Sequence, residues 1–400
     1  MEGMSLPVRM VKQEELLECE KIQSVAFVYS LNTAELQKKL ETEPQPNAPY
    51  IGYFNDEGMV TACMELPEYR MRYEGHWVPM VGIGGVASLP EHRFGGAIRQ
   101  IFQVAFRRML ESGAVFSALY PFSHAYYRKF GYELCQTTMG YELPVQSLSA
   151  FRYDGRVRMI RPGDSLDGLK ALFDAHFLRC NLAIQREERH WKQLLGEDAY
   201  KERVYAYLLE DENGPSAYVV LAAEDAGPYE KNGNVREIAY VRPQGLRDAL
   251  GFLYRLSAQY AKLRIPLPDG VPLPALLPES YDVKAGIREQ PMARVIDVRQ
   301  ALTLKRHFDG ARYTLCVRDE ILPENDGLFA VRCEGGEVSV ERREDGEADL
   351  TLDVRTLTQL LLGYLSLDEA LYKSDVSAGA NLDTLRRVFV KQPVFLTDHF

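Results

Sequence analysis

The stretch that decides the fold is residues 81–132, VGIGGVASLPEHRFGGAIRQIFQVAFRRMLESGAVFSALYPFSHAYYRKFGY. Its pattern predicts a strand, a glycine-rich turn, an amphipathic helix, a second strand and a short helix. A turn that opens a helix leaves N–H groups without partners, and the helix dipole favours an anion beside them. We therefore expect an anion site at this turn, where Arg93 and Arg99 add positive charge.

Two motifs in this stretch carry a resemblance to a known family. Residues 93–98 read Arg-x-x-Gly-x-Ile directly after a strand, and residues 127–132 read YRKFGY. In this order they resemble the acetyl-CoA site of GNAT-superfamily acetyltransferases. The second motif is similar to a segment of one subgroup, the enhanced intracellular survival (Eis) acetyltransferases. The resemblance implies an acetyl-CoA-dependent N-acetyltransferase that modifies a primary amine of a small molecule by direct attack in a ternary complex.

The resemblance also implies where acetyl-CoA binds. In GNAT proteins the strand before the turn splays from its neighbour, and its backbone pairs with pantetheine and the thioester carbonyl. Glycines inside a strand suit close approach of a ligand, which here fits Gly82, Gly84 and Gly85. The amides of the turn would cradle the pyrophosphate. The expected cofactor contacts are Val86, Ala87, Arg93, Phe94, Gly95, Gly96, Ala97, Ile98 and Arg99.

Two residues are the expected catalytic groups. Departure of the CoA thiolate requires a proton, and a tyrosine hydroxyl with a pKa near ~10 can supply it at neutral pH. The Eis resemblance places this general acid at Tyr127; for Tyr126, packing against the sheet is the favoured reading. It also implies that the carboxylate of Phe400 acts in the N-terminal active site as a general base, directly or through water. A docked but inert terminus is the alternative.

The rest of the chain predicts an α/β (α+β) fold with three domains. Residues 1–150 form the catalytic GNAT domain, with a strand over 135–143 that closes its sheet. Residues 151–290 form a second, degenerate GNAT-like domain in which a strand over 234–241 and a helix over 246–263 repeat the first pattern. The turn between them lacks the double glycine, so we expect no pyrophosphate there.

The third domain, residues 291–400, alternates short apolar strands with glycine-bearing turns, which we expect to pair antiparallel, and ends in helices. This pattern resembles sterol carrier proteins. Sterol binding does not follow, because in the Eis subgroup this domain is a scaffold that delivers the C-terminal carboxylate. The predicted architecture is thus two GNAT-type mixed-sheet domains in tandem, the second degenerate, followed by a sterol-carrier-protein-like domain.

Composition excludes several classes of function. The hydrophobic content of 46% and the charged content of 26% are those of a globular protein. The net charge of −10 and the lack of a basic tract argue against nucleic acid as a partner. Six scattered cysteines, without a C-x-x-C pair or a histidine cluster, predict no metal site and no disulfide framework. No signal-peptide pattern or long apolar run occurs, so we expect a cytoplasmic protein without a membrane partner. A homo-oligomer is a separate expectation.

The acceptor itself is left open by the sequence. The pocket is expected between residues 22–40 and 69–75, with Phe27, Tyr29, Ser30 and Glu65 as candidate lining residues. Aminoglycosides and polyamine-like amines are candidate acceptors. Some family members that modify aminoglycosides have an acidic penultimate residue, whereas here His399 follows Asp398, which argues against an aminoglycoside preference. The competing functions are a non-catalytic acetyl-CoA- and lipid-binding protein and a peptide or protein lysine acetyltransferase.

Overall fold

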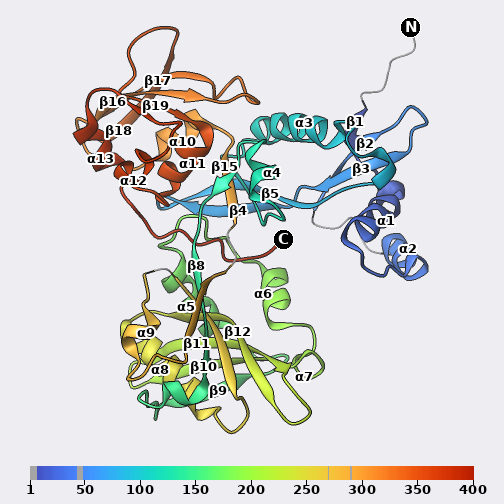
Figure 1. Cartoon of the computed structure of the whole chain (residues 1–400), viewed down its shortest axis with the longest axis vertical. Helices are drawn as coiled ribbons and strands as arrows, with labels where there is room; N and C mark the ends of the chain where they lie inside the picture. The colour runs from blue at the N-terminus through green and yellow to red at the C-terminus, as the bar shows by residue number, and fades with distance from the viewer. Residues whose placement is uncertain (1–6, 43–47, 269, 289–290) are drawn as a thin grey trace. The chain divides into compact units, whose positions relative to one another are not determined.

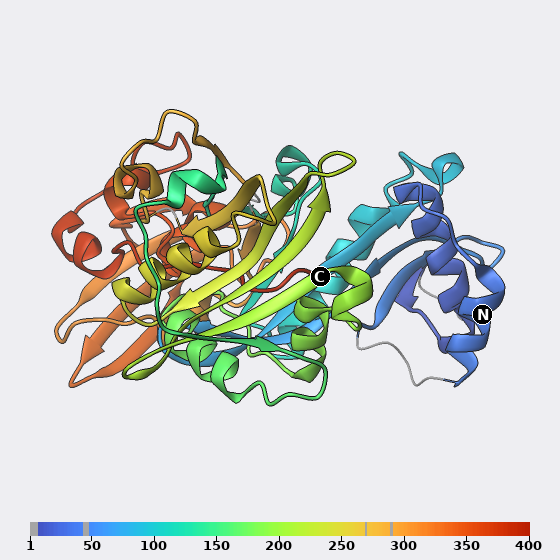
Figure 2. The same cartoon turned by 90° about the horizontal axis from the view of Figure 1, so that it is seen from below.

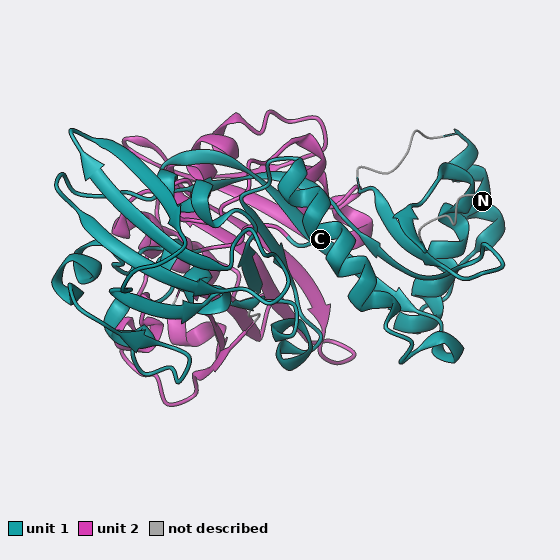
Figure 3. Ribbon diagram, turned by 90° about the horizontal axis from the view of Figure 1, so that it is seen from above, with its two compact units in different colours: residues 1–135, 291–394, 399–400 teal, residues 136–290, 395–398 magenta. Residues whose placement is uncertain are grey.

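The computed structural model describes residues 7–42, 48–268, 270–288 and 291–400. The chain divides into two compact units (Figure 3). Unit 1 comprises Met1–Cys135, Pro291–Val394 and His399–Phe400, and unit 2 comprises Gln136–Gln290 and Phe395–Asp398. Each unit is therefore assembled from segments that lie far apart in the sequence. No helix in the described part of the chain is both long and apolar enough to cross a bilayer.

An eight-stranded mixed sheet in unit 1 contains residues 81–88 (Figure 1). The strand order is β1-β2-β3-β5-β6-β15-β7, with β4 paired to β5, and only β5 and β6 are parallel. The strands are β1 (Val8–Met10), β2 (Tyr50–Phe54), β3 (Val60–Glu65), β4 (Glu68–Tyr73), β5 (His76–Ser88), β6 (Phe116–Leu119), β7 (Glu133–Leu134) and β15 (Met292–Val295). The predicted strands over 50–54 and 60–66 are confirmed.

Helices cover both faces of this sheet because its strands carry apolar side chains that point alternately to one face and to the other. On one face, α3 (Ala97–Glu111) buries Ile101, Phe102, Ala105, Phe106 and Met109 at helical spacing against Ala62 and Met64 of β3. On the other face, α1 (Leu16–Phe27) packs Cys19 and Ile22 against Cys63 and Ala87. The remaining helices of this part are η1 (Gln13–Glu15), α2 (Thr33–Thr42), η2 (Pro90–His92) and α4 (His124–Arg128).

The prediction that a strand over 135–143 closes the first sheet is wrong. The strand forms as β8 (Thr138–Pro144), but it pairs with β13 and β14 in the sheet of unit 2. The place next to β6 in the first sheet is taken by β15, which comes from beyond residue 290. The reason is packing: the alternating residues Tyr141 and Leu143 are buried in the core of unit 2.

Unit 2 contains a seven-stranded sheet in the order β14-β8-β13-β12-β11-β10-β9. Its long strands β11 and β12 lie side by side, in yellow-green (Figure 2). The strands are β9 (Arg156–Ile160), β10 (Val204–Asp211), β11 (Gly214–Asp225), β12 (Lys231–Tyr240), β13 (Lys262–Pro268) and β14 (Lys284–Ile287). The helices are η3 (Val145–Leu148), α5 (Asp167–Phe177), α6 (Glu188–Leu195), α7 (Ala199–Glu202), α8 (Pro243–Arg255) and α9 (Leu273–Leu276).

The second strand-turn-helix has the predicted order but different bounds. The helix α8 buries Leu246, Ala249, Leu250 and Leu253 and ends at Arg255, before the predicted end at 263. Leu263, Ile265 and Leu267 are buried at a spacing of two, which is the period of a strand. They belong to β13, which runs parallel to β12.

The C-terminal part of unit 1 is a five-stranded sheet in the order β18-β17-β16-β19-β20. We expected antiparallel pairing throughout, but β19 runs parallel to β16 because the β17–β18 hairpin returns the chain to the starting direction. The strands are β16 (Arg312–Arg318), β17 (Gly327–Glu334), β18 (Glu337–Arg343), β19 (Leu350–Asp353) and β20 (Ser377–Ala378). The helices are α10 (Val298–Leu304), α11 (Val354–Leu362), α12 (Leu367–Ala370) and α13 (Leu382–Val388).

Candidate active site

The strand β5 loses one of its two neighbours halfway along. Its parallel pairing with β6 ends at Ile83, opposite Leu119. Its antiparallel pairing with β3 continues to Ser88, opposite Ala62. No strand of the described chain pairs with the β6-facing edge of residues 84–88. An unpaired strand edge presents free N–H and C=O groups, so this half-strand can bind an extended ligand by backbone hydrogen bonds.

Both predicted backbone contacts lie in this half-strand. Val86 is half-buried and packs toward the α3 face, while Ala87 is buried on the α1 face. The half-strand also contains a bulge, because Met64 of β3 faces both Gly85 and Val86. The backbone of Gly85 is left-handed, with φ +53°. The bulge and the loss of pairing with β6 together open the sheet at this point.

The turn between β5 and α3 is exposed and has an unusual backbone. Arg93, Phe94, Gly95 and Gly96 are all exposed, and both Phe94 (φ 66°) and Gly96 (φ 79°) adopt left-handed conformations. Left-handed residues ahead of a helix N-terminus turn successive N–H groups toward one point, which makes an anion-binding nest. A side chain on Gly96 would meet nothing within 4 Å, so the space above the turn is open.

The first turn of α3 continues this nest. Ala97 is buried, Ile98 is half-buried and Arg99 is exposed. The first N–H groups of an α-helix have no acceptor within the helix. Arg93 and Arg99 are exposed cations on either side of these amides. The predicted cofactor residues thus form two adjoining features, an unpaired strand edge and an open, positively charged helix start.

The side chain of Phe400 lies directly on the glycines of β5. A Cβ atom on Gly82 would come within 2.6 Å of the Phe400 ring, and one on Gly84 within 3.7 Å of the Phe400 carboxyl carbon. The ring centroid of Phe400 is 4.9 Å from that of Tyr69 and 6.0 Å from that of Tyr120. We expected these glycines to suit close approach of a ligand, and at Gly82 and Gly84 Phe400 itself makes a close approach.

Tyr127 is held in an aromatic cluster next to the point where β5 and β6 separate. It is 4% exposed and shares one hydrophobic core with Ile83 and Leu119. Its ring centroid lies 5.3 Å from those of Phe122 and Tyr126. Among the described residues, none is a hydrogen-bond partner of its hydroxyl. Burial raises the pKa of Tyr127 above its ordinary value, so the hydroxyl stays protonated at neutral pH and is a proton donor.

The residues that precede Phe400 are anchored within unit 2. Arg186, whose side chain is 2% exposed, donates from Nε to Asp398 at 2.8 Å and from Nη2 to the Thr397 carbonyl at 3.0 Å. Its two terminal nitrogens donate to Glu237 at 2.8 and 2.6 Å. Burial alone would lower the pKa of Arg186, but the Glu237 and Asp398 carboxylates raise it by more. Its pKa therefore lies above the ordinary value, and Arg186 remains charged. Asp398 is therefore occupied by a buried ion pair.

Sequence reasoning missed Arg186, which anchors the residues before Phe400 within unit 2. Arg186 gave no signal, because the polar run of residues 185–190 that contains it matches no motif. Glu65 was named only as a candidate for lining the pocket, and the structure places it opposite Gly84 on β3. Its position as the last residue of a strand before Pro67 was the available signal.

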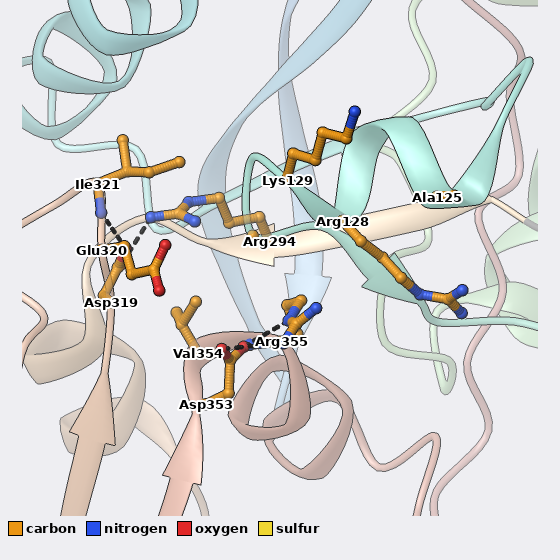
Figure 4. A pocket seen from close by; sticks show the side chains of 11 residues that line it. Ala125, Arg128, Lys129, Arg294, Asp319, Glu320, Ile321, Asp353, Val354 and Arg355 are labelled. Carbon is orange, nitrogen blue, oxygen red and sulfur yellow. Dashed lines mark hydrogen bonds and ion pairs between the residues drawn. The ribbon is translucent and has the colours of Figure 1, made fainter. Parts of the chain in front are cut away.

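A cavity of about 380 Å³ lies between α4 and the C-terminal sheet within unit 1 (Figure 4). Its lining contains two ion pairs: Arg294 donates to Asp319 at 2.6 Å, and Arg355 donates to Asp353 at 2.7 Å. The residues that line it include none of the predicted catalytic or cofactor-binding residues. This charged lining is unsuited to a sterol-like ligand.

Three known domain families match the chain in succession. A GNAT acetyltransferase domain matches residues 7–135, and a second GNAT acetyltransferase domain matches residues 182–295. A sterol carrier protein domain matches residues 298–397. The first match ends just before the chain leaves unit 1, and it contains the unpaired edge of β5, the turn and Tyr127. A search of curated protein sequences found no match.

Solved structures match nearly the whole chain. A GCN5-related N-acetyltransferase from Anabaena variabilis superposes with a TM-score of 0.84 at 22% identity, over 98% of this chain and 100% of that one. A probable N-acyltransferase from Enterococcus faecalis gives 0.87 at 23% identity, over 98% and 99%. Eis1 from Mycobacterium abscessus gives 0.78 at 20% identity, over 99% and 100%. At these identities the likeness concerns the fold. The chain is a GNAT-superfamily acyltransferase with the Eis-like arrangement of two GNAT domains and a C-terminal sterol carrier protein domain.

Proposed function

We propose that this chain transfers the acetyl group of acetyl-CoA to a primary amine of a small molecule. One observation carries the proposal. The unpaired edge of residues 84–88 adjoins the nest at residues 94–99, and the carboxyl group of Phe400 lies over Gly84 at the start of that edge. A thioester, a diphosphate and an amine each find a matching group within unit 1.

In this proposal acetyl-CoA is bound mainly by backbone. Free N–H and C=O groups on the unpaired edge of residues 84–88, the half-strand that contains Val86 and Ala87, pair with pantetheine and hydrogen-bond the thioester carbonyl. The amides of residues 94–99 bind the diphosphate, with Arg93 and Arg99 as charged partners. Hydrogen bonds to the thioester carbonyl also stabilise the negative charge that develops on its oxygen during attack.

The transfer itself requires two proton movements. The amine nitrogen attacks the thioester carbonyl carbon, the C–N bond forms and the C–S bond breaks. The Tyr127 hydroxyl donates a proton to the departing sulfur and regains one from solvent. The proton lost by the nitrogen passes to the carboxylate of Phe400, directly or through water. The raised pKa of Tyr127 suits a donor and excludes it as the base at neutral pH.

The test is a transfer assay with acetyl-CoA and a panel of aminoglycosides, polyamines, lysine peptides and simple aryl and alkyl amines. Release of CoA and mass spectrometry of the amine report turnover. We expect Tyr127→Phe to lower kcat by about 100-fold or more, the lower end of general-acid effects, with the Kd of acetyl-CoA unchanged. Tyr126→Phe is the matched control, because it removes the neighbouring hydroxyl.

Two results would contradict the proposal. If the wild-type protein binds acetyl-CoA but acetylates no amine of the panel, it is a binding protein. If Tyr127→Phe retains wild-type kcat, a different group supplies the proton.

A further inference from the structure

A second carboxyl group lies beside the carboxyl group of Phe400. Glu65 is the last residue of β3 and pairs with Gly84 across the sheet. The position of a Cβ atom on Gly84 is 3.8 Å from a Glu65 carboxylate oxygen and 3.7 Å from the Phe400 carboxyl carbon. Two carboxyl groups therefore border the same glycine, at the point where β5 leaves β6.

The Glu65 side chain is fixed by its neighbours. The buried amide of Gln23, on α1, donates to Oε1 of Glu65 at 2.8 Å and to the Gly85 carbonyl at 3.2 Å. A Cβ atom on Gly85 would lie 2.1 Å from the Gln23 amide nitrogen, so the glycine is required for this contact. Gln23 thus ties Glu65 to the bulge of β5, which leaves the second oxygen of Glu65 directed at Gly84.

The surroundings of Glu65 are acidic. Among the described residues, no Lys, Arg or His forms an ion pair with it. Glu20 lies on the same face and accepts a hydrogen bond from the Tyr50 hydroxyl at 2.8 Å. Burial, together with the charges of Glu65 and Glu20, raises the pKa of Tyr50, so this phenol stays neutral. Like charges so close together repel, and a cation placed between them removes the repulsion.

We propose that Glu65 binds the acceptor amine in its ammonium form, together with the carboxylate of Phe400. This inference rests on the proposed function and names its substrate class. The acceptor is an alkyl amine, which is protonated at neutral pH. Aryl amines, which are neutral at that pH, are poor acceptors because they leave both carboxylates unpaired. Glu65 is a positioning residue: it holds the ammonium beside the thioester and takes no part in bond making. The ammonium first passes one proton to the Phe400 carboxylate, and from there to solvent, so that the neutral nitrogen can attack and then lose its second proton by the same route.

The experiment compares benzylamine with aniline at pH 7, using wild-type protein, Glu65→Gln, Glu65→Asp and the control Glu57→Gln. Glu57 is an exposed turn residue at the other end of β3. A hydrogen bond to a charged group is worth about 1.5–3 kcal/mol, so Glu65→Gln should raise the KM for benzylamine by about 10-fold or more. Glu65→Asp keeps the charge and should recover part of the affinity. The KM for acetyl-CoA and the Tm should stay unchanged.

The outcomes separate this inference from the proposed function. If the wild-type protein transfers the acetyl group and Glu65→Gln has an unchanged KM for benzylamine, the role of Glu65 is overturned, whereas the proposed function stands. Aniline acetylated as efficiently as benzylamine by the wild-type protein also overturns it, and that result needs no variant to fold. Acetyl-CoA binding without transfer to any amine overturns the proposed function and this inference with it.

Discussion

The two GNAT domains share a strand followed by a helix but join them differently. In the first, residues 89–96 connect β5 to α3, and Phe94 and Gly96 within them are left-handed. In the second, Val241 and Arg242 connect β12 to α8, and the helix begins at Pro243. A proline at the first helical position removes an N–H group that an anion would need. The long turn can therefore bind a phosphate, and the short one cannot.

The glycines at the two helix starts serve opposite purposes: Gly96 directly precedes α3, whereas Gly245 lies in the first turn of α8. A Cβ atom on Gly96 would meet nothing within 4 Å, whereas one on Gly245 would lie 2.3 Å from the carbonyl oxygen of Ser216. Gly96 leaves space for a ligand, and Gly245 allows α8 to pack against β11. A glycine at the start of a helix therefore indicates a binding site only when the space above it is open.

The second domain has also lost the free polar groups of a binding site. β12 pairs with β13 only over Asn232–Asn234, so these strands separate much as β5 and β6 do. Beyond that point, Glu237 binds Arg186, which in turn holds Asp398. The place that could take a cofactor thus anchors the C-terminal segment of the chain. The same architecture leaves an unpaired strand edge in one copy and holds its own chain in the other.

The largest expected effect comes from breaking that anchor. Arg186→Met leaves Glu237 and Asp398 buried without a cation, which costs about 3–5 kcal/mol. We expect a matching drop in the free energy of unfolding of unit 2, measured by urea denaturation. Trp191 fluorescence is the probe, and Trp77→Phe in both proteins removes the other tryptophan. Because Phe400 is two residues beyond Asp398, kcat should fall as well. The control is Arg203→Met, since the Arg203–Asp225 pair is exposed and contributes little to stability. Equal losses in the two variants would contradict the anchor.

A smaller effect is expected from acid, again in the second domain. Burial lowers the pKa of His176 to about 4, and its Nδ1 lies 2.7 Å from the Tyr240 carbonyl oxygen. In the unfolded chain the imidazole takes a proton near pH ~6.5. The unfolding free energy should therefore fall between pH 6.5 and 4, with a slope of up to ~1.4 kcal/mol per pH unit.

The measurement for this prediction is urea unfolding at several pH values, with Trp191 as the probe. His176→Asn cannot titrate and should flatten the slope over this range. A slope that is the same in both proteins would show that other groups are responsible.

The sequence predicted the local features of the first domain well, because they depend on short-range pattern. The strand-turn-helix around Gly96, the hairpin strands and the position of Tyr127 all follow from periodicity and motif. It failed where distant segments decide the outcome. The apolar alternation of β8 is satisfied by either sheet, so its partner was not predictable. The contacts of Gly82 with Phe400 and of Arg186 with Asp398 join residues more than 200 positions apart.

We propose that only the first domain binds acetyl-CoA, and isothermal titration calorimetry can count the molecules bound. We predict one molecule of acetyl-CoA per chain. Gly96→Ala forces a side chain into the left-handed region at a cost of roughly 1–2 kcal/mol, so the Kd should rise about 10-fold. Gly245→Ala should lower the Tm and leave the Kd unchanged. Two molecules per chain, or a Kd that responds to Gly245→Ala and not to Gly96→Ala, would contradict the account.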